Sequence, residues 1–217
     1  MLEENYIDFI RLNHEHPLDE AQKKQFLKYI ELLEKWSRKI NLTSRGDINK
    51  IVAKHITESL LYNTADIQNK TNIVDLGSGA GFPGIPLKIM HPQKRMILLE
   101  SRRLKAEFLQ RIVDALELGN ISVLCQRIEN LSPDQFGTID VITARAVGPL
   151  YKLWTWTRPL LTVGGVLVVI KGGDIWSEIE KIKKSFYDFD AQTKNTGYIS
   201  TSHNQLYEIK LIKKLGK

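Results

Sequence analysis

An apolar run that ends in an acid, followed at once by closely spaced glycines, occupies residues 73–84 (Ile-Val-Asp-Leu-Gly-Ser-Gly-Ala-Gly-Phe-Pro-Gly). The apolar run predicts a buried strand, and the glycines predict a tight loop at its end. Glycine has no Cβ atom, so a bound group can approach its backbone closely, and it tolerates the positive φ angles of a tight turn. The segment therefore predicts a strand that runs into a loop able to cradle a nucleotide-like cofactor.

Two cofactor classes are compatible with this loop. Gly79, Gly81 and Gly84 satisfy the G-x-G-x-x-G fingerprint of dinucleotide-binding folds, although that short pattern alone has low specificity. Asp75 precedes three alternating glycines, and the resulting Asp-x-Gly-x-Gly-x-Gly resembles the first motif of class I S-adenosylmethionine-dependent methyltransferases. That resemblance implies that the amides of Gly77 and Gly79 face the methionine part of the cofactor. It also implies that the acid orients the loop or the methionine amine.

After this loop, short apolar runs alternate with amphipathic segments, which is typical of a doubly wound α/β sheet. We expect strands near 72–76, 95–100, 121–125, 138–143 and 164–170, and helices near 84–91, 102–118, 148–160 and 174–187. Residues 196–200 and 205–212 alternate in the strand period, which predicts an antiparallel pair beside the parallel sheet. The class I methyltransferase fold has such a pair. We therefore expect that Rossmann-like α/β fold, with a mostly parallel seven-stranded sheet and a C-terminal antiparallel hairpin.

The chain divides into two expected domains. Apolar residues between Phe26 and Ile40 recur at helix spacing, and Asp47 is placed to cap a second helix that reaches Leu61. Residues 1–64 are therefore expected to form a helical extension suited to RNA recognition, and residues 65–217 a methyltransferase domain. Only about forty residues follow Gly173, too few for the second substrate domain that hydride transfer usually requires. This favours the methyl donor over a nicotinamide cofactor.

Basic residues outnumber acids, with a net charge of +6 and a sequence pI of about 9.3. They gather in residues 35–54, which hold six bases against one acid, in residues 102–105, and at the C-terminal end after Lys210. These clusters make nucleic acid the leading partner. No apolar run approaches the ~20 residues of a membrane span, and the first residues lack signal-peptide features. We therefore expect a cytoplasmic protein that is not bound to membranes.

Further positions fit a nucleoside. Glu100 ends the second expected strand, where an acid accepts hydrogen bonds from ribose hydroxyls. Both candidate cofactors carry a ribose, so Glu100 does not choose between them. In class I methyltransferases the residues after the third strand lie along the adenine, which places Ile128 against the ring and Glu129 near its amine. Cys125, the single cysteine, is expected to be buried and structural, and it cannot form an internal disulfide or a cysteine-based zinc site.

The residues after the fourth strand narrow the chemistry. Residues 141–149 lack the Asn/Asp-Pro-Pro-aromatic motif common in methyltransferases that act on exocyclic amines. Carbon-5 methylation of a pyrimidine needs a cysteine nucleophile, and Cys125 is expected to lie at the cofactor side of the sheet. An acceptor with a free lone pair, such as guanine N7, needs neither group and no general base. No catalytic base is assigned, and Arg145 and Lys171 are expected to position the acceptor or to stabilise charge.

Several motifs together resemble the bacterial RsmG family, also called GidB. They are Asn41-Leu-Thr43, His55 with Ser59, residues 75–87, Arg127-Ile-Glu129, Ala144-Arg-Ala146 and Ile170-Lys-Gly172. The resemblance covers nearly the whole chain. It implies S-adenosylmethionine-dependent methylation at N7 of one guanosine in the 530-loop region of 16S rRNA. It also implies cofactor contacts at Gly77, Phe82, Ile128, Glu129 and Arg145. Family members often have aspartate where Glu100 stands, and either acid can bind the ribose. The resemblance assigns no role to His55.

Two other functions stay open at the level of sequence. The first keeps the cofactor but replaces RNA with a small molecule or a protein, which the basic residues 35–54 disfavour. The second is an RNA-binding module that has the fold without catalysis. The choice between isolated 16S rRNA and the assembled small subunit is also open, as is the oligomeric state, for which a monomer is favoured.

Overall fold

A single seven-stranded sheet organises the part of the chain that the computed structural model describes, residues 18–40, 48–132, 137–200 and 204–215. The side chains of residues 37–40 and 48–53 lie outside that description, and so do the expected Asn41-Leu-Thr43 motif and the expected cap Asp47. The strands are β1 (Asn72–Leu76), β2 (Arg95–Leu99), β3 (Ile121–Leu124), β4 (Ile139–Ala144), β5 (Leu161–Lys171), β6 (Phe189–Ile199) and β7 (Gln205–Lys213).

The strand order is β3-β2-β1-β4-β5-β7-β6. The first five strands pair in parallel, whereas β7 pairs antiparallel with both β5 and β6. After β1 the chain moves outward through β2 to β3, and it then returns to place β4 on the other side of β1. Open α/β sheets bind ligands at the carboxyl ends of the strands that flank such a switch point. The loops after β1 and β4 therefore stand at the expected ligand position.

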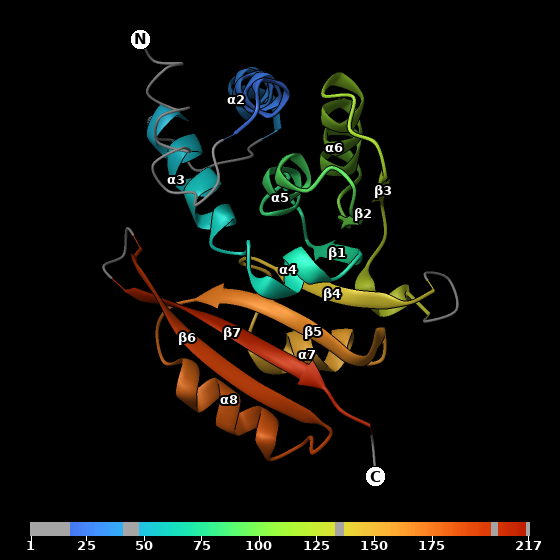
Figure 1. Ribbon diagram of the computed structural model, residues 1–217, viewed down its shortest axis with the longest axis vertical. Helices are drawn as coiled ribbons and strands as arrows, with labels where there is room; N and C mark the ends of the chain where they lie inside the picture. Colours follow the sequence, from blue (N-terminus) through green and yellow to red (C-terminus); the bar gives the residue numbers. More distant parts are fainter. Residues whose placement is uncertain (1–17, 41–47, 133–136, 201–203, 216–217) are drawn as a thin grey trace.

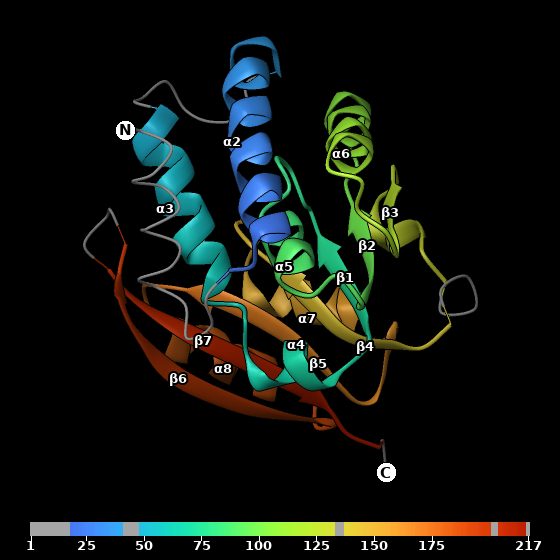
Figure 2. The ribbon, with the colours of Figure 1, turned by 45° about the horizontal axis from the view of Figure 1, so that its top comes forward.

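Helices cover both faces of the sheet (Figures 1 and 2). One face carries α2 (Glu20–Ile40), α3 (Ile48–Leu60), α4 (Ala65–Asn69), α5 (Gly84–Met90) and α6 (Arg103–Ala115). The other carries the 3-10 turn η1 (Ile128–Asn130), α7 (Leu150–Thr157) and α8 (Ile175–Lys183). Alternate strand residues feed the two cores, since Ile73 and Val141 join the first cluster while Val74 and Ile142 join the second. This is the expected Rossmann-like arrangement.

Helix α2 begins at a capping box. The backbone amide of Gln22 donates to the Asp19 carboxylate at 2.8 Å, and the Asp19 amide donates to the Gln22 side chain at 3.0 Å. Phe26 and Leu33 then point into the same core cluster as Ile85 of α5, so α2 packs directly on the layer that follows the glycine loop. Helices from both sides of residue 64 share this core, so the core does not mark a domain boundary there. The domain boundary expected near residue 64 stays a prediction.

Two buried tyrosines tie the N-terminal helices to the ends of the sheet. The Tyr29 hydroxyl donates to the carbonyl oxygen of Ala80, within the glycine loop, at 2.8 Å. The Tyr62 hydroxyl donates to the carbonyl oxygen of Ala144 at 2.8 Å and accepts from the amide of Ile170 at 3.0 Å. Tyr62 thus bridges β4 and β5 where their pairing ends, between Ala144 and the residue that follows its partner Val169.

Most expected elements agree with the structure, but two expectations were incomplete or wrong. Strand β6 begins at Phe189, seven residues before the expected start, because pairing with β7 holds the polar residues of an edge strand in extended form. Cys125 is exposed and not buried. It follows β3, which lies at the edge of the sheet and has no fully buried residue, so the apolar pattern there does not mark an interior position.

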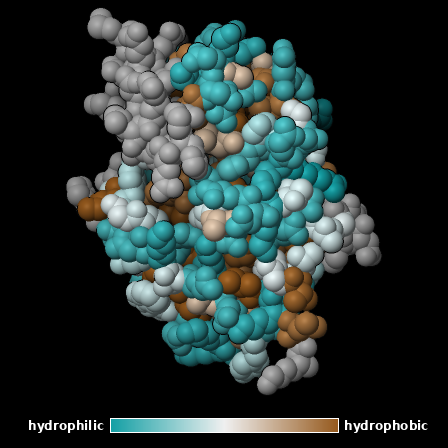
Figure 3. Space-filling model, in the orientation of Figure 1, coloured by the Kyte–Doolittle hydropathy of each residue, from teal (hydrophilic) through white to brown (hydrophobic). Residues whose placement is uncertain are grey.

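The coloured part of the face in Figure 3 is mostly hydrophilic, with apolar patches between. Among the helices of the described residues, none is long and apolar enough to cross a membrane.

Replacing Tyr62 with phenylalanine should lower the free energy of unfolding by about 1–3 kcal/mol, because the buried Ala144 carbonyl and Ile170 amide both lose their partner. Urea denaturation followed by circular dichroism measures this change. Tyr187→Phe, on a side chain that is 88% exposed, is the matched control and should have little effect. Equal unfolding midpoints for the two variants would contradict the bridging role of Tyr62.

Candidate active site

The glycine loop between β1 and α5 has the backbone that its sequence predicts. Gly77, Gly79 and Gly81 have φ angles of 69°, 58° and 103°, in the region that favours glycine. A Cβ atom on Gly77 would lie 2.7 Å from a methyl carbon of Val147, and one on Gly84 would lie 2.4 Å from a methyl carbon of Leu98. The loop is therefore packed against its surroundings on one side and leaves no room there for larger residues.

Asp75 holds this loop from beneath. Its side chain is completely buried, and it accepts hydrogen bonds from the Gly84 amide at 3.1 Å and from the Thr143 hydroxyl at 2.9 Å. Burial raises the pKa of the Asp75 carboxyl to about 6, and these hydrogen bonds and the charge of Arg145 act in the opposite direction. This acid was expected to orient either the loop or the methionine amine. Its contacts in the structure are with the loop and with β4.

Glu100 stands at the end of β2 beside the same loop. One of its carboxylate oxygens accepts from the Gly79 amide at 3.0 Å, and the other accepts from the Arg102 amide at 2.8 Å. The residue is only 6% exposed. A carboxylate has about four lone-pair sites, so these two bonds leave acceptor capacity for ribose hydroxyls. Glu100 therefore links the loop to the position where a nucleoside sugar is expected.

A cavity of about 160 Å³ lies beside these groups and brings together three of the predicted cofactor residues. Gly77, Ile128 and Glu129 line it, together with Val147 and Trp156, which were not predicted. Ile128 is buried in η1 and packs with the core on that side of the sheet. The Gly77 backbone forms one wall of the cavity, and the Ile128 side chain and the exposed acid Glu129 form the other. Such walls suit an adenosine group. The described residues are therefore compatible with the cofactor that the sequence predicts.

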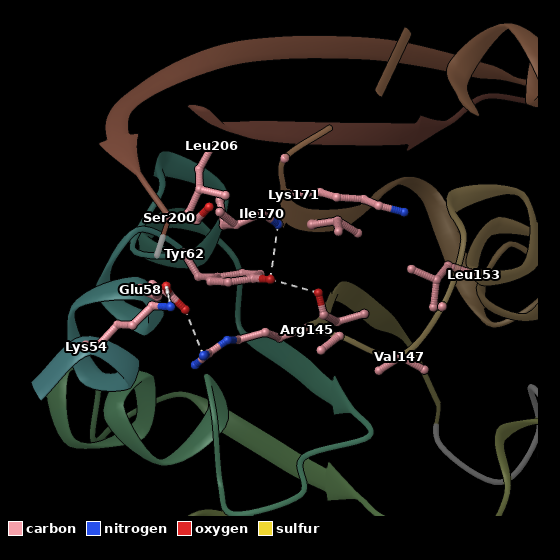
Figure 4. Close-up of a pocket in the computed structure, with 15 residues that line it drawn as sticks. Lys54, Glu58, Tyr62, Arg145, Val147, Leu153, Ile170, Lys171, Ser200 and Leu206 are labelled. Atoms are coloured by element: carbon pink, nitrogen blue, oxygen red, sulfur yellow. Dashed lines mark hydrogen bonds and ion pairs between the residues drawn. The ribbon is translucent and has the colours of Figure 1, made fainter. Parts of the chain in front are cut away.

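A second cavity, of about 300 Å³, opens on the other side of Val147 at the carboxyl ends of β4 and β5 (Figure 4). Its lining includes the predicted residues Arg145 and Lys171, together with Lys54, Glu58 and Tyr62. Val147 lines both cavities. Its neighbour Ala146 has a φ angle of 55°, a strained value for a residue with a Cβ atom. The turn after β4 thus forms the partition between the two cavities.

Arg145 is anchored on helix α3. Its guanidinium donates to the Glu58 carboxylate at 2.8 Å and to the His55 carbonyl oxygen at 3.2 Å, and it also contacts the His55 ring nitrogen Nδ1. The same group lies 5.6 Å from the centre of the Phe82 ring, within cation–π range. The side chain is only 16% exposed. Two predicted positions, Phe82 and Arg145, therefore meet through a contact that the sequence alone did not suggest.

His55 acts within this contact as a neutral ring. Burial and the charges of Arg145 and Lys54 lower the pKa of His55 to about 4, so it is uncharged near neutral pH. Its ring centre lies 5.3 Å from that of Phe82. The sequence left its role open. The structure places it as a support for Arg145 and the glycine loop.

Lys171 and Glu58 carry the remaining charge at the second cavity. Lys171, at the end of β5, forms an ion pair with Glu178 of α8. Sequence analysis missed Glu58, although it lies between the motif residues His55 and Ser59 on one helix and so could have been placed with them. In the described part of the chain, no group of three or more histidine, cysteine or acidic side chains is arranged to hold a metal ion.

The strand order, the glycine loop and the acids that end β1 and β2 define a class I S-adenosylmethionine-dependent methyltransferase fold. A solved structure with this fold is the O-methyltransferase TomG from Streptomyces achromogenes in complex with SAM. It is 16% identical, has a TM-score of 0.63, and the match covers 98% of this chain and 99% of that one.

The chain belongs to the rRNA small subunit methyltransferase G family (GidB), whose model matches residues 22–207. One relative, ribosomal RNA small subunit methyltransferase G of Roseiflexus castenholzii, is 39% identical over 76% of this chain and 72% of its own length. The protein of the same name from Aster yellows witches'-broom phytoplasma is 36% identical over 81% of this chain and 84% of its own length. The family expected from the sequence is thereby confirmed.

Replacing Asp75 with asparagine should change how stability depends on pH. Because the pKa of Asp75 is about 6 in the folded chain and 3.8 as its ordinary value, ionisation costs the folded state more than the unfolded state. The stability that the Asp75 carboxyl contributes to the wild-type fold is fully present below pH 4 and is lost as pH rises to about 6. The stability of wild type relative to Asp75→Asn should therefore fall by roughly 2–4 kcal/mol across this window.

Urea denaturation at several pH values measures that difference. Asp190→Asn, on an exposed ion pair of β6, is the matched control and should not reproduce the pH-dependent change. A constant difference between wild type and Asp75→Asn from pH 4 to 7 would show that the buried carboxyl does not titrate in this way.

Proposed function

We propose that this protein transfers the methyl group of S-adenosylmethionine to N7 of a specific guanosine in the 530-loop region of 16S rRNA. Family membership supports the methyl donor and the small-subunit rRNA. The observation that carries the proposal is the pair of cavities on either side of Val147. One is lined by expected cofactor residues. The other is lined by cations and hydrogen-bond acceptors at the ends of β4 and β5.

The cofactor would be held by residues of the first cavity and of the glycine loop and strand ends beside it. When bound, S-adenosylmethionine supplies a methyl group on a positively charged sulfur. Gly77 and Gly79 would offer backbone amides to its methionine part, with Asp75 fixing their loop and Phe82 closing it. Glu100 would accept from the ribose, while Ile128 and Glu129 would meet the adenine. The cofactor contact expected for Arg145 would be made from its anchored position beside Phe82.

The residues of the second cavity suit an acceptor that needs no base. Guanine N7 carries a free lone pair and no proton, so its methylation releases no proton at the reacting atom. His55, which supports the lining residue Arg145, has Nδ1 in contact with the guanidinium and is a poor candidate for proton transfer. Arg145 and Lys171 would instead position the base or its phosphate and stabilise charge. This leaves in-line positioning as the main catalytic contribution of the chain.

RNA is the expected partner of the surface around these cavities. Arg102 and Arg103 are exposed at the start of α6, shortly after the acid Glu100. Lys54 of α3 lines the second cavity. These cations would meet phosphates near both ends of the site. We propose that residues 1–64 recognise RNA while residues 65–217 bind the cofactor. We further propose that the protein acts as a monomer in the cytoplasm, where ribosomal RNA is modified.

Incubation with tritiated S-adenosylmethionine tests the proposal directly. We expect label in 16S rRNA from cells that lack this gene, at a single guanosine in the 530-loop region. Comparing isolated 16S rRNA with assembled 30S subunits will show which one is the substrate. RNA from cells that carry the gene is the matched control and should accept little label. Tight cofactor binding without incorporation into either substrate would overturn the enzymatic proposal.

Replacing Arg145 with alanine should lower turnover about 100-fold to 1,000-fold while the fold is retained. The reason is that the guanidinium lines the second cavity and is held in a fixed position there by Glu58 and the His55 carbonyl. Lysine at this position would keep the charge but lose the fork that joins Glu58 to the His55 carbonyl, and should recover only part of the rate. Unchanged turnover and cofactor affinity in Arg145→Ala would remove this residue from the site.

A further inference from the structure

The second cavity contains an acid that a binding site for RNA would not be expected to have. Glu58, on α3, lines the cavity and its side chain is only 12% exposed. RNA is a polyanion, so a carboxylate in its path is unfavourable unless it meets a group other than phosphate. A nucleobase edge that carries hydrogen-bond donors is such a group.

Two cations hold the Glu58 carboxylate in a fixed orientation. Its Oε2 atom accepts from Arg145 at 2.8 Å, and its Oε1 atom lies 3.3 Å from the Lys54 ammonium. Each carboxylate oxygen has two lone-pair sites, so one cation on each oxygen leaves further acceptor sites on both. Figure 4 shows the carboxylate with these two cations at one side of the cavity. The group is therefore a pre-organised pair of acceptors.

We propose that Glu58 recognises the Watson–Crick edge of the target guanine and thereby selects the base to be methylated. This inference rests on the proposed function. Guanine presents two adjacent donors on that edge, N1–H and N2–H, and a carboxylate can accept from both at once. Adenine presents an acceptor at N1, which a carboxylate would repel. A base that is splayed out of its stack exposes this edge for such contacts.

The position of Glu58 also fits attack by N7. In guanine, N7 lies on the opposite side of the ring system from the N1 and N2 donors. In Figure 4, Glu58 and Val147 lie on opposite sides of the cavity, and Val147 is the residue shared with the first cavity. A guanine bound by Glu58 would therefore direct N7 toward the partition. The cavity volume of about 300 Å³ is at the lower end of sites that hold small ligands.

Charge movement in the reaction strengthens this contact. As the N7–carbon bond forms, the bond from that carbon to sulfur breaks, and sulfur keeps the electron pair. The positive charge of the sulfonium passes to the guanine, and no proton leaves. The cationic ring makes N1–H and N2–H stronger donors, so the bonds to Glu58 gain strength in the transition state. The acid also offsets the repulsion between a cationic base and its neighbours Arg145 and Lys54.

Replacing the target guanosine with inosine tests the proposal. Inosine lacks the N2 amine of guanosine but keeps N7 and N1–H. We would ligate a synthetic segment with guanosine or inosine at the target position into 16S rRNA, and measure single-turnover kcat/KM on each RNA. The wild-type enzyme should prefer guanosine by about 10-fold to 100-fold, the effect of one hydrogen bond to a charged acceptor.

The Glu58→Gln variant separates base recognition from support of Arg145. Glutamine has only one acceptor oxygen, so the variant should lose most of the preference and treat the two RNAs within about threefold of each other. Glu178→Gln also removes an acid from an ion pair near the site, with Lys171, and is the matched control. It should affect both RNAs equally and keep the wild-type preference.

Several outcomes would overturn the inference. One is a wild-type enzyme that methylates both RNAs equally well. Another is a Glu58→Gln variant that loses activity on both RNAs by the same factor, which would assign Glu58 only to the support of Arg145. If Glu58→Gln is too slow for kinetics, binding of the two RNAs with S-adenosylhomocysteine provides the same ratio. Failure of the wild type to methylate the guanosine RNA at all would instead contradict the proposed function.

Discussion

The buried carboxylate of Asp75 is the contact on which the geometry of the site depends. It joins the Gly84 amide, at the start of α5, to the Thr143 hydroxyl on β4. One side chain thus fixes the glycine loop relative to β4, the strand that Arg145 follows. Removing such a group from water is costly, and its hydrogen bonds offset part of that cost. Asp75 therefore ties the loop beside the first cavity to the strand whose end borders the second.

Sequence reasoning succeeded where the signal is local. The glycine loop, the acid near the end of β1 and the alternation of strands with helices depend on residue type and short spacing, and all three are present in the structure. It failed where the tertiary environment decides. Cys125 follows an apolar run yet is exposed, because β3 lies at the sheet edge. No local pattern could have revealed that its strand has a neighbour on only one side.

The same limit applies to the candidate site. Arg145 was predicted from its place after β4, but its partner Glu58 lies 87 residues away in the sequence. Hydrophobic periodicity places Glu58 on a helix without saying which strand that helix covers. Val147 was missed for a similar reason, since its importance lies in touching two cavities whose other walls come from distant segments. The chemistry of a position was therefore easier to predict than its neighbours.

Tyr62 has a consequence for how substrate recognition and catalysis are connected. Its hydroxyl lies between the Ala144 carbonyl and the Ile170 amide, so the proposed RNA-recognition extension, residues 1–64, completes the hydrogen bonding of the sheet at the rim of the second cavity. The extension cannot then be exchanged like a separate adaptor. A different recognition element would have to supply an equivalent bridge, or the rim of the cavity would open. Under the proposed function, substrate choice is thus built into the same framework that shapes the second cavity.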